Sequence, residues 1–223
     1  MDYIILYLVI LIVPAIASIN IRSTYGKYKQ QKNKNGLSGF EVARKVLDAN
    51  GLEKLYIVEV KGELTDHYDP SQKVVRLSTD IFHGETIAAA AVAAHECGHA
   101  IQDKENYAFM RIRATLVPIV NLITYAAYIM FAVSMIFQIM DLMPVAFVSV
   151  LFSLVFQLVT LPVEFDASKR ALVQLKELEL VDNKEHEGTK KMLTAAALTY
   201  VASVLSSVAN LLRIVLSYTN RRR

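Results

Sequence analysis

The sequence predicts a mainly α-helical membrane protein, with four apolar helices and a small α+β domain that contains a short sheet. The composition is 54% hydrophobic and only 20% charged, which is too apolar for an ordinary soluble domain. The apolar residues are concentrated in four uncharged stretches, and about 20 apolar residues in a helix span the hydrocarbon core of a bilayer. These stretches are residues 3–21, 114–140, 142–163 and 192–212.

The four stretches divide the chain into five segments. We predict an N-terminal transmembrane anchor at 1–21, a polar domain at 22–113, a transmembrane hairpin at 114–163, a polar segment at 164–191, and an apolar helix with a basic tail at 192–223. The net charge is only +3, and the cations lie beside apolar stretches rather than along a groove. This distribution disfavours a nucleic-acid partner.

The first stretch is followed, not preceded, by positive charge. Ala15-Ile16-Ala17 resembles a signal-peptide cleavage site, but Asp2 is the only charged side chain before the apolar run. We therefore predict an uncleaved anchor. By the positive-inside rule, the cations that follow it hold the next domain in the cytoplasm. These cations are Arg22, Lys27, Lys29, Lys32 and Lys34.

The polar domain combines helix and strand signals. In order, we expect a juxtamembrane linker at 25–39, a helix at 40–49 capped by Ser38 or Gly39, strands at 55–60 and 73–77, and an alanine-rich helix from 85 to about 104. Asp69-Pro70-Ser71 predicts the turn between the strands. Residues 74–77 form a candidate edge strand to which an extended peptide could pair.

The second and third apolar stretches are separated by a single charge, Asp141, with Pro144 just beyond it. So short a connection predicts an antiparallel hairpin, which returns the chain to the side of the membrane that it left. Glu164 is the first charged residue after the hairpin, and Pro162 is expected to fix the start of a polar helix at 164–180.

The last stretch is rich in Ala, Ser and Thr, small residues that let helices approach closely, so we expect it to pack against the other helices. If it spans the membrane, Arg213 and Arg221 to Arg223 emerge on the non-cytoplasmic side, against the positive-inside rule. Both a spanning and a re-entrant helix remain open.

The polar domain carries a metal-binding pattern. His95 and His99 are four residues apart in a helical stretch, which places them one turn along the same face, with a rise of about 6 Å. Two imidazoles at this spacing can share one tetrahedral ion. Glu96 lies about 100° round the helix, which suits a carboxylate that takes a proton from a metal-bound water.

A catalytic zinc usually has three protein ligands and one open position for water. Glu164 is the candidate third ligand, and Asp166 is the alternative. Only one of them can bind the metal, because residues two apart on a helix point about 200° apart. Glu164 could also be an interfacial charge that marks the membrane boundary. Cys97 points away from His95 by the same geometry, so packing is its expected role.

Three segments carry a family resemblance: HECGHAIQ at 95–102, LTDHYDP at 64–70 and LPVEFDAS at 161–168. They resemble the YugP-type membrane zinc metallopeptidases, which are distant gluzincin relatives of the HtpX-like and CAAX-prenyl proteases. The resemblance implies a zincin-like domain at the cytosolic face, with one zinc ion per chain on His95, His99 and Glu164. The HtpX-like pattern places an aspartate four residues after the ligand glutamate, whereas this chain has Ser168.

A gluzincin often needs a donor that steadies the oxyanion of the reaction. The candidates are His67, Tyr68, His83 and Arg170. Each also has a structural interpretation: His67 and Tyr68 lie in an expected turn, His83 precedes a helix start, and Arg170 suits a solvated helix face.

The leading hypothesis is an endopeptidase in the plasma membrane of a prokaryote, with its active site at the cytosolic face. Its expected partners are the lipid bilayer and peptide or protein substrates, either unfolded or membrane-derived. A non-catalytic metal-binding scaffold or sensor, with a fourth protein ligand, is the alternative. A site-2-type intramembrane protease is a further alternative, but only nine uncharged residues separate Glu85 from His95, too few for a spanning helix.

Overall fold

The computed structural model describes residues 2–137 and 142–221. Its helices are α1 (Asp2–Lys29), α2 (Gly39–Ala49), α3 (Thr79–Phe82), α4 (Ile87–Lys104), α5 (Ala108–Phe137), α6 (Met143–Glu177) and α7 (Asn183–Arg221). Its strands are β1 (Tyr56–Val60), β2 (His67–Asp69) and β3 (Val74–Ser78).

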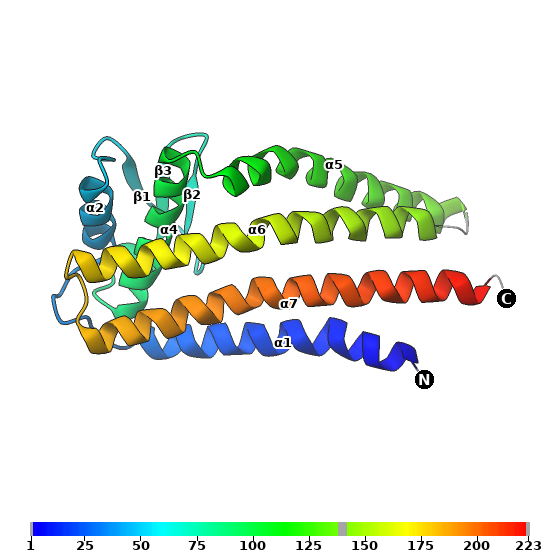
Figure 1. The fold of residues 1–223 in the computed structure, drawn as a ribbon, viewed down its shortest axis with the longest axis horizontal. Coiled ribbons are helices and arrows are strands. Elements are labelled where there is room, and N and C mark those ends of the chain that lie inside the picture. The colour runs from blue at the N-terminus through cyan, green and yellow to red at the C-terminus, as the bar shows by residue number, and fades with distance from the viewer. Residues whose placement is uncertain (1, 138–141, 222–223) are drawn as a thin grey trace.

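Four long helices, α1, α5, α6 and α7, run along the long axis of the molecule, and α2, α4 and the sheet lie together at one end (Figure 1). Helix α7 packs against both α1 and α6, and α5 packs against α6. The first and last described residues lie near the opposite end from the sheet. The predicted class, a mainly α protein with four apolar helices and a small α+β domain, is confirmed.

Each of the four long helices is long and apolar enough to cross a membrane. Along the apolar window of α1 and of α5 no residue is buried, whereas 33% of the α7 window is buried. Helix α7 is thus the inner helix of the bundle. Its buried alanines allow the close packing that the small residues predict: Ala195, Ala197, Ala202 and Ala209.

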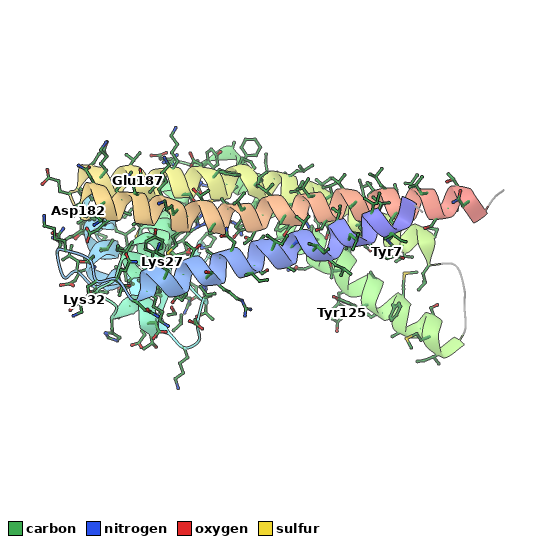
Figure 2. The ribbon with its side chains drawn as sticks, turned by 90° about the horizontal axis from the view of Figure 1, so that it is seen from below. Tyr7, Lys27, Lys32, Tyr125, Asp182 and Glu187 are labelled. Atoms are coloured by element: carbon green, nitrogen blue, oxygen red, sulfur yellow. The ribbon has the colours of Figure 1, made fainter. Side chains whose placement is uncertain are left out.

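The two ends of the bundle differ in polarity. The end that holds the sheet carries charged side chains, among them Lys27, Lys32, Asp182 and Glu187, while Tyr7 lies towards the opposite end (Figure 2). There the Arg213 guanidinium stacks over the Tyr7 ring at 5.4 Å and donates to Asn210. These contacts give the Arg213 charge polar partners at the end of α7 away from the sheet.

Several helices are longer than predicted. Helix α1 continues through most of the predicted linker to Lys29, because Tyr25 and Tyr28 bury their rings in the core of the domain. Helix α6 passes through Pro162 without ending, and membrane helices tolerate such prolines because neighbouring helices and local adjustments satisfy the freed backbone group. Helix α7 is continuous, so a re-entrant turn is wrong for its described residues.

All four predicted segment boundaries, at 21/22, 113/114, 163/164 and 191/192, fall inside these helices. The polar domain and the apolar bundle therefore share continuous elements. The predicted hairpin turn at Asp141 lies outside the described residues.

The sheet has the strand order β1-β3-β2, with β1 parallel and β2 antiparallel to β3. The prediction that residues 74–77 form an edge strand is wrong, because β3 is the central strand. The edge position beside α4 belongs to β2, which is only three residues long and leaves no periodic signal. The turn at Asp69-Pro70-Ser71 joins β2 to β3, so His67 and Tyr68 lie in a strand rather than in a turn.

Helix α2 begins with a capping box, in which the Ser38 hydroxyl accepts from the Glu41 amide and the Glu41 carboxylate accepts from the Ser38 amide. Its apolar face packs on α4. The alanines of α4 are almost fully buried, and their small side chains allow both α2 and α6 to pack closely against it.

Candidate metal centre

Helix α4 presents both motif histidines to one side. The Thr86 hydroxyl caps its first turn, and the helix is buried along most of its length, so the side-chain directions of the motif are fixed. The rings of His95 and His99 lie 4.8 Å apart at an angle of 82°. Helix α4 is not one of the four candidate membrane spans, unlike the motif helix of a site-2-type protease.

Helix α6 brings Glu164 to the two imidazoles. The Glu164 Oε2 atom lies 3.3 Å from His95 Nε2 and 3.6 Å from His99 Nε2, and the carboxylate is only 3% exposed. One ligand atom from each of the three side chains lies within 4.8 Å of the other two. Among the described residues this is the group of histidine, cysteine and acidic side chains that can hold a metal ion, and its two nitrogens and one oxygen suit zinc.

Gly98 permits this approach of α6 to α4. A Cβ atom at position 98 would lie 2.6 Å from the Ala167 carbonyl oxygen and 3.1 Å from its Cα. These are backbone atoms, which cannot turn aside as a flexible side chain can. Any side chain at position 98 would therefore push α6 outward, together with Glu164.

The His99 ring is held from behind by Gln102. His99 Nδ1 lies 3.0 Å from Gln102 Oε1, while Gln102 Nε2 donates to the Val163 carbonyl and, at 2.9 Å, to Asp166. Because the amide nitrogen is used in those bonds, the amide oxygen accepts from His99 Nδ1–H. The lone pair of His99 is then on Nε2, the nitrogen that faces Glu164.

The other imidazole has a similar support. The Ser168 hydroxyl lies 3.3 Å from His95 Nδ1. Ser168 is one helical turn after Glu164, in the position where the HtpX-like pattern has aspartate. The hydroxyl thus gives the His95 ring a neutral partner at this position.

The second oxygen of Glu164 has its own partner. The Arg113 guanidinium on α5 donates to Glu164 Oε1 at 3.2 Å. This ion pair compensates the burial of the carboxylate. It also fixes the carboxylate so that Oε2 faces the imidazoles.

Glu96 is buried and is oriented by the backbone of β2. Its Oε2 atom accepts a hydrogen bond of 2.9 Å from the Tyr68 amide. The Tyr68 hydroxyl donates to Asp103, and burial together with this carboxylate raises the pKa of Tyr68. Tyr68 therefore stays protonated, with its hydroxyl bonded to Asp103 on α4.

Two cavities meet at the centre. A polar cavity of about 370 Å³ lies between β2 and α5, and its lining includes His67, His99 and Arg113. An apolar cavity of about 170 Å³ lies between α1, α4 and α7, and its lining includes Val92 and Met192. Both cavities are also lined by Asp66, His95, Glu96, Glu164 and Tyr200.

The comparisons with known proteins agree on one family. The sequence model of a family described as "Putative neutral zinc metallopeptidase" matches residues 3–219, almost the whole chain. The chain belongs to this family of zinc metallopeptidases. It is 40% identical over 206 residues to a Bacillus subtilis (strain 168) protein named "Putative membrane protease YugP", and the match covers 92% of each chain. No solved structure matches the chain.

Four other residues that the sequence analysis weighed lie apart from the three candidate ligands. His83 is exposed and contacts Glu59, and Arg170 pairs with Asp166 and Glu105. Neither lines the two cavities. The Asp166 carboxylate is used by Gln102 and Arg170, and Cys97 is buried against the Ala43 carbonyl. Burial, with the adjacent Glu96 carboxylate, raises the pKa of the Cys97 thiol.

The sequence patterns did not predict a role at the centre for three of its residues: Gln102, Arg113 and Tyr200. The first two lie near the motif in sequence, but glutamine and arginine are ordinary residues at helix ends. Tyr200 lies in an apolar stretch, where a tyrosine suggests a membrane interface. The available signal was the spacing of Gln102 from His99, since residues three apart contact each other on a helix.

Proposed function

We propose that the chain is a membrane-embedded, zinc-dependent endopeptidase that uses His95, His99 and Glu164 as ligands and Glu96 as general base and acid. The observation that carries the proposal is the three-ligand group beside a buried carboxylate, with His95, Glu164 and Glu96 on the wall shared by two cavities. Three protein ligands leave one position for water, as catalytic zinc requires and structural zinc does not. This favours catalysis over a scaffold or sensor.

When bound, zinc is a Lewis acid that activates a water and polarises the peptide carbonyl. Glu96 accepts the proton of the attacking water and returns it to the leaving amine. The Tyr68 amide keeps the Glu96 carboxylate in one orientation during both transfers. Tyr200 lines both cavities, so we assign its hydroxyl as the donor to the developing oxyanion, with His67 as the other candidate in the polar cavity.

The proposed location is the plasma membrane of a prokaryote, with the centre at the cytosolic face. The support is the charge at the domain end of the bundle, where α1 ends in Lys27 and Lys29 and Lys32 follows. A centre at the cytosolic face would be accessible to unfolded polypeptides and to segments that emerge from the bilayer.

Removal and return of zinc test the proposal. A chelator such as 1,10-phenanthroline should abolish cleavage of an unfolded protein substrate by the detergent-purified chain, and one equivalent of zinc per chain should restore it. Zinc content is measured by mass spectrometry and its coordination by X-ray absorption. Tightly held zinc with four protein ligands and no cleavage would instead establish the scaffold.

The apolar cavity predicts which side chain the enzyme accepts at the cleaved bond. Its 170 Å³ is close to the roughly 150 Å³ of an apolar protein cavity that takes up benzene, so it fits a leucine or phenylalanine side chain. Tyr25 also lines the cavity, and its hydroxyl is buried without a hydrogen-bond partner among the described residues.

Ala196→Phe should fill this cavity. For a peptide with Leu or Phe at the selected position, kcat/KM should fall about 10- to 100-fold relative to the same peptide with Ala, because burial of a large apolar side chain is worth about 1.5–3 kcal/mol. Leu198→Phe, two residues on and 45% exposed, is the matched control and should leave the ratio unchanged. Equal losses for both peptides in Ala196→Phe would show that the cavity is not the subsite.

A further inference from the structure

A second groove lies between α6 and α7, on the side of α6 away from the polar cavity. Its volume is about 340 Å³, and residues of both helices line it. On α6 the lining residues are Ser168 and the set Phe165, Lys169, Leu172, Val173 and Lys176; on α7 they are the set His186, Lys190, Leu193, Thr194 and Ala197. In both sets the spacing is i, i+4, i+7, i+8 and i+11, so each set forms a stripe along one helix face.

The groove changes polarity along its length. Because α6 runs towards the domain and α7 runs away from it, Phe165 and Ala197 lie at the membrane end of the groove, and Lys176 and His186 lie at the outer end. The groove spans twelve residues of each helix, a rise of about 16 Å. It is therefore apolar towards the bilayer and cationic towards the water.

None of the described residues that line the groove is acidic, so the groove itself contains no negative charge that would offset its lysines. In the described parts of the chain, Lys169, Lys176 and Lys190 form no ion pair, although other lysines such as Lys29 and Lys73 do. Three unpaired ammonium groups around an apolar floor favour a ligand that carries both a negative charge and a hydrocarbon chain.

The depth of the groove matches the lipid headgroups. The uncharged stretches end at Val163 and begin again at Met192, so Lys169 lies about 9 Å beyond one end and Lys190 about 3 Å beyond the other. The headgroup region is roughly 5–7 Å thick on each side, and lysine side chains extend along apolar surface to place their charge there. Both ammonium groups can reach a phosphate in that layer.

We propose that this groove binds one anionic phospholipid, whose phosphate contacts Lys169 and Lys190 and whose acyl chain lies along Phe165, Leu193 and Ala197. The lipid holds the domain against the leaflet. Leu193 and Ala197 also line the apolar cavity of the metal centre, so the lipid shares a wall with that cavity. The lipid site does not depend on the proposed peptidase activity.

Native mass spectrometry of the detergent-purified full chain tests the site. The first phosphatidylglycerol molecule should bind about tenfold more tightly than the first phosphatidylcholine molecule, because each lysine near a headgroup contributes appreciably to anionic lipid binding. The double variant Lys169→Gln/Lys190→Gln should remove this preference. An excess of inorganic phosphate should not displace the lipid.

A neighbouring cavity supplies the matched control. Lys27 and Lys191 line a cavity between α1 and α7 that also contains the acidic Glu187 and shares Lys190 and Thr194 with the groove. They lie six residues and one residue beyond the ends of their uncharged stretches, which nearly equals the depth of Lys169 and Lys190. Lys27→Gln/Lys191→Gln should keep the preference for phosphatidylglycerol. Equal loss in both double variants, displacement by phosphate, or no preference in the unmodified chain would overturn the proposal.

Discussion

Glu96→Gln should bind zinc as the unmodified chain does and lose peptidase activity by about 10²- to 10⁴-fold in kcat, the usual contribution of a general acid or base. Glutamine has the same shape, and its Oε1 atom can still accept the hydrogen bond that the Tyr68 amide donates to Glu96. What it lacks is a carboxylate that can take up a proton. The structure around it and the three proposed ligands should therefore remain intact.

The measurement is steady-state cleavage with zinc content determined on the same sample. Glu53→Gln, an exposed residue after α2, is the control for the same chemical change and should keep full activity. If Glu96→Gln cleaved as fast as the control, Glu96 would not be the base. If it lost zinc, Glu96 would belong to the metal ligands.

Glu164→Gln should lower zinc affinity by more than about 100-fold, because loss of groups that merely support ligands already costs about 10- to 100-fold. Arg113 contributes to this result. It donates to Glu164 Oε1, so it will hold the oxygen of a glutamine amide in the same place. The amide NH₂ group, which cannot bind zinc, then faces His95 and His99.

Asp166→Asn tests the alternative ligand with the same type of change, two residues along α6. Its carboxylate accepts from Gln102 and Arg170, one step removed from His99, so we expect a loss of at most about tenfold. Zinc affinity is measured by competition with a chromophoric chelator, and circular dichroism checks the helix content of both variants. A larger loss in Asp166→Asn than in Glu164→Gln would reverse the assignment of the third ligand.

The residues of the centre differ in how strongly a local sequence pattern predicts them. His95, Glu96 and His99 lie within one turn and a half of a helix, and an alanine-rich helix has a strong local signal. Their mutual geometry is therefore a property of the helix itself. The apolar stretches are equally visible, because about 20 apolar residues in a row have few other uses.

The support of the centre was less visible, because it depends on contacts between helices. Gly98 appears in the sequence as a poor helix former, and only the contact with the Ala167 backbone gives it a role. Ser168 departs from the HtpX-like pattern, yet its hydroxyl lies against His95. Tyr200 comes from the last helix, about 100 residues after the motif, and no local pattern connects the two.

The sequence by itself determined the class of the protein, the four apolar helices and the proposed chemistry of the motif helix, because each depends on residues that are neighbours along the chain. Tertiary structure decided where Glu164 stands, which groups hold the imidazoles and which cavities flank them. The physical reason is that the buried carboxylate of Glu164 on α6 needs several partners at once, and these come from α4 and α5. Their meeting depends on the close approach of α4 and α6 at Gly98.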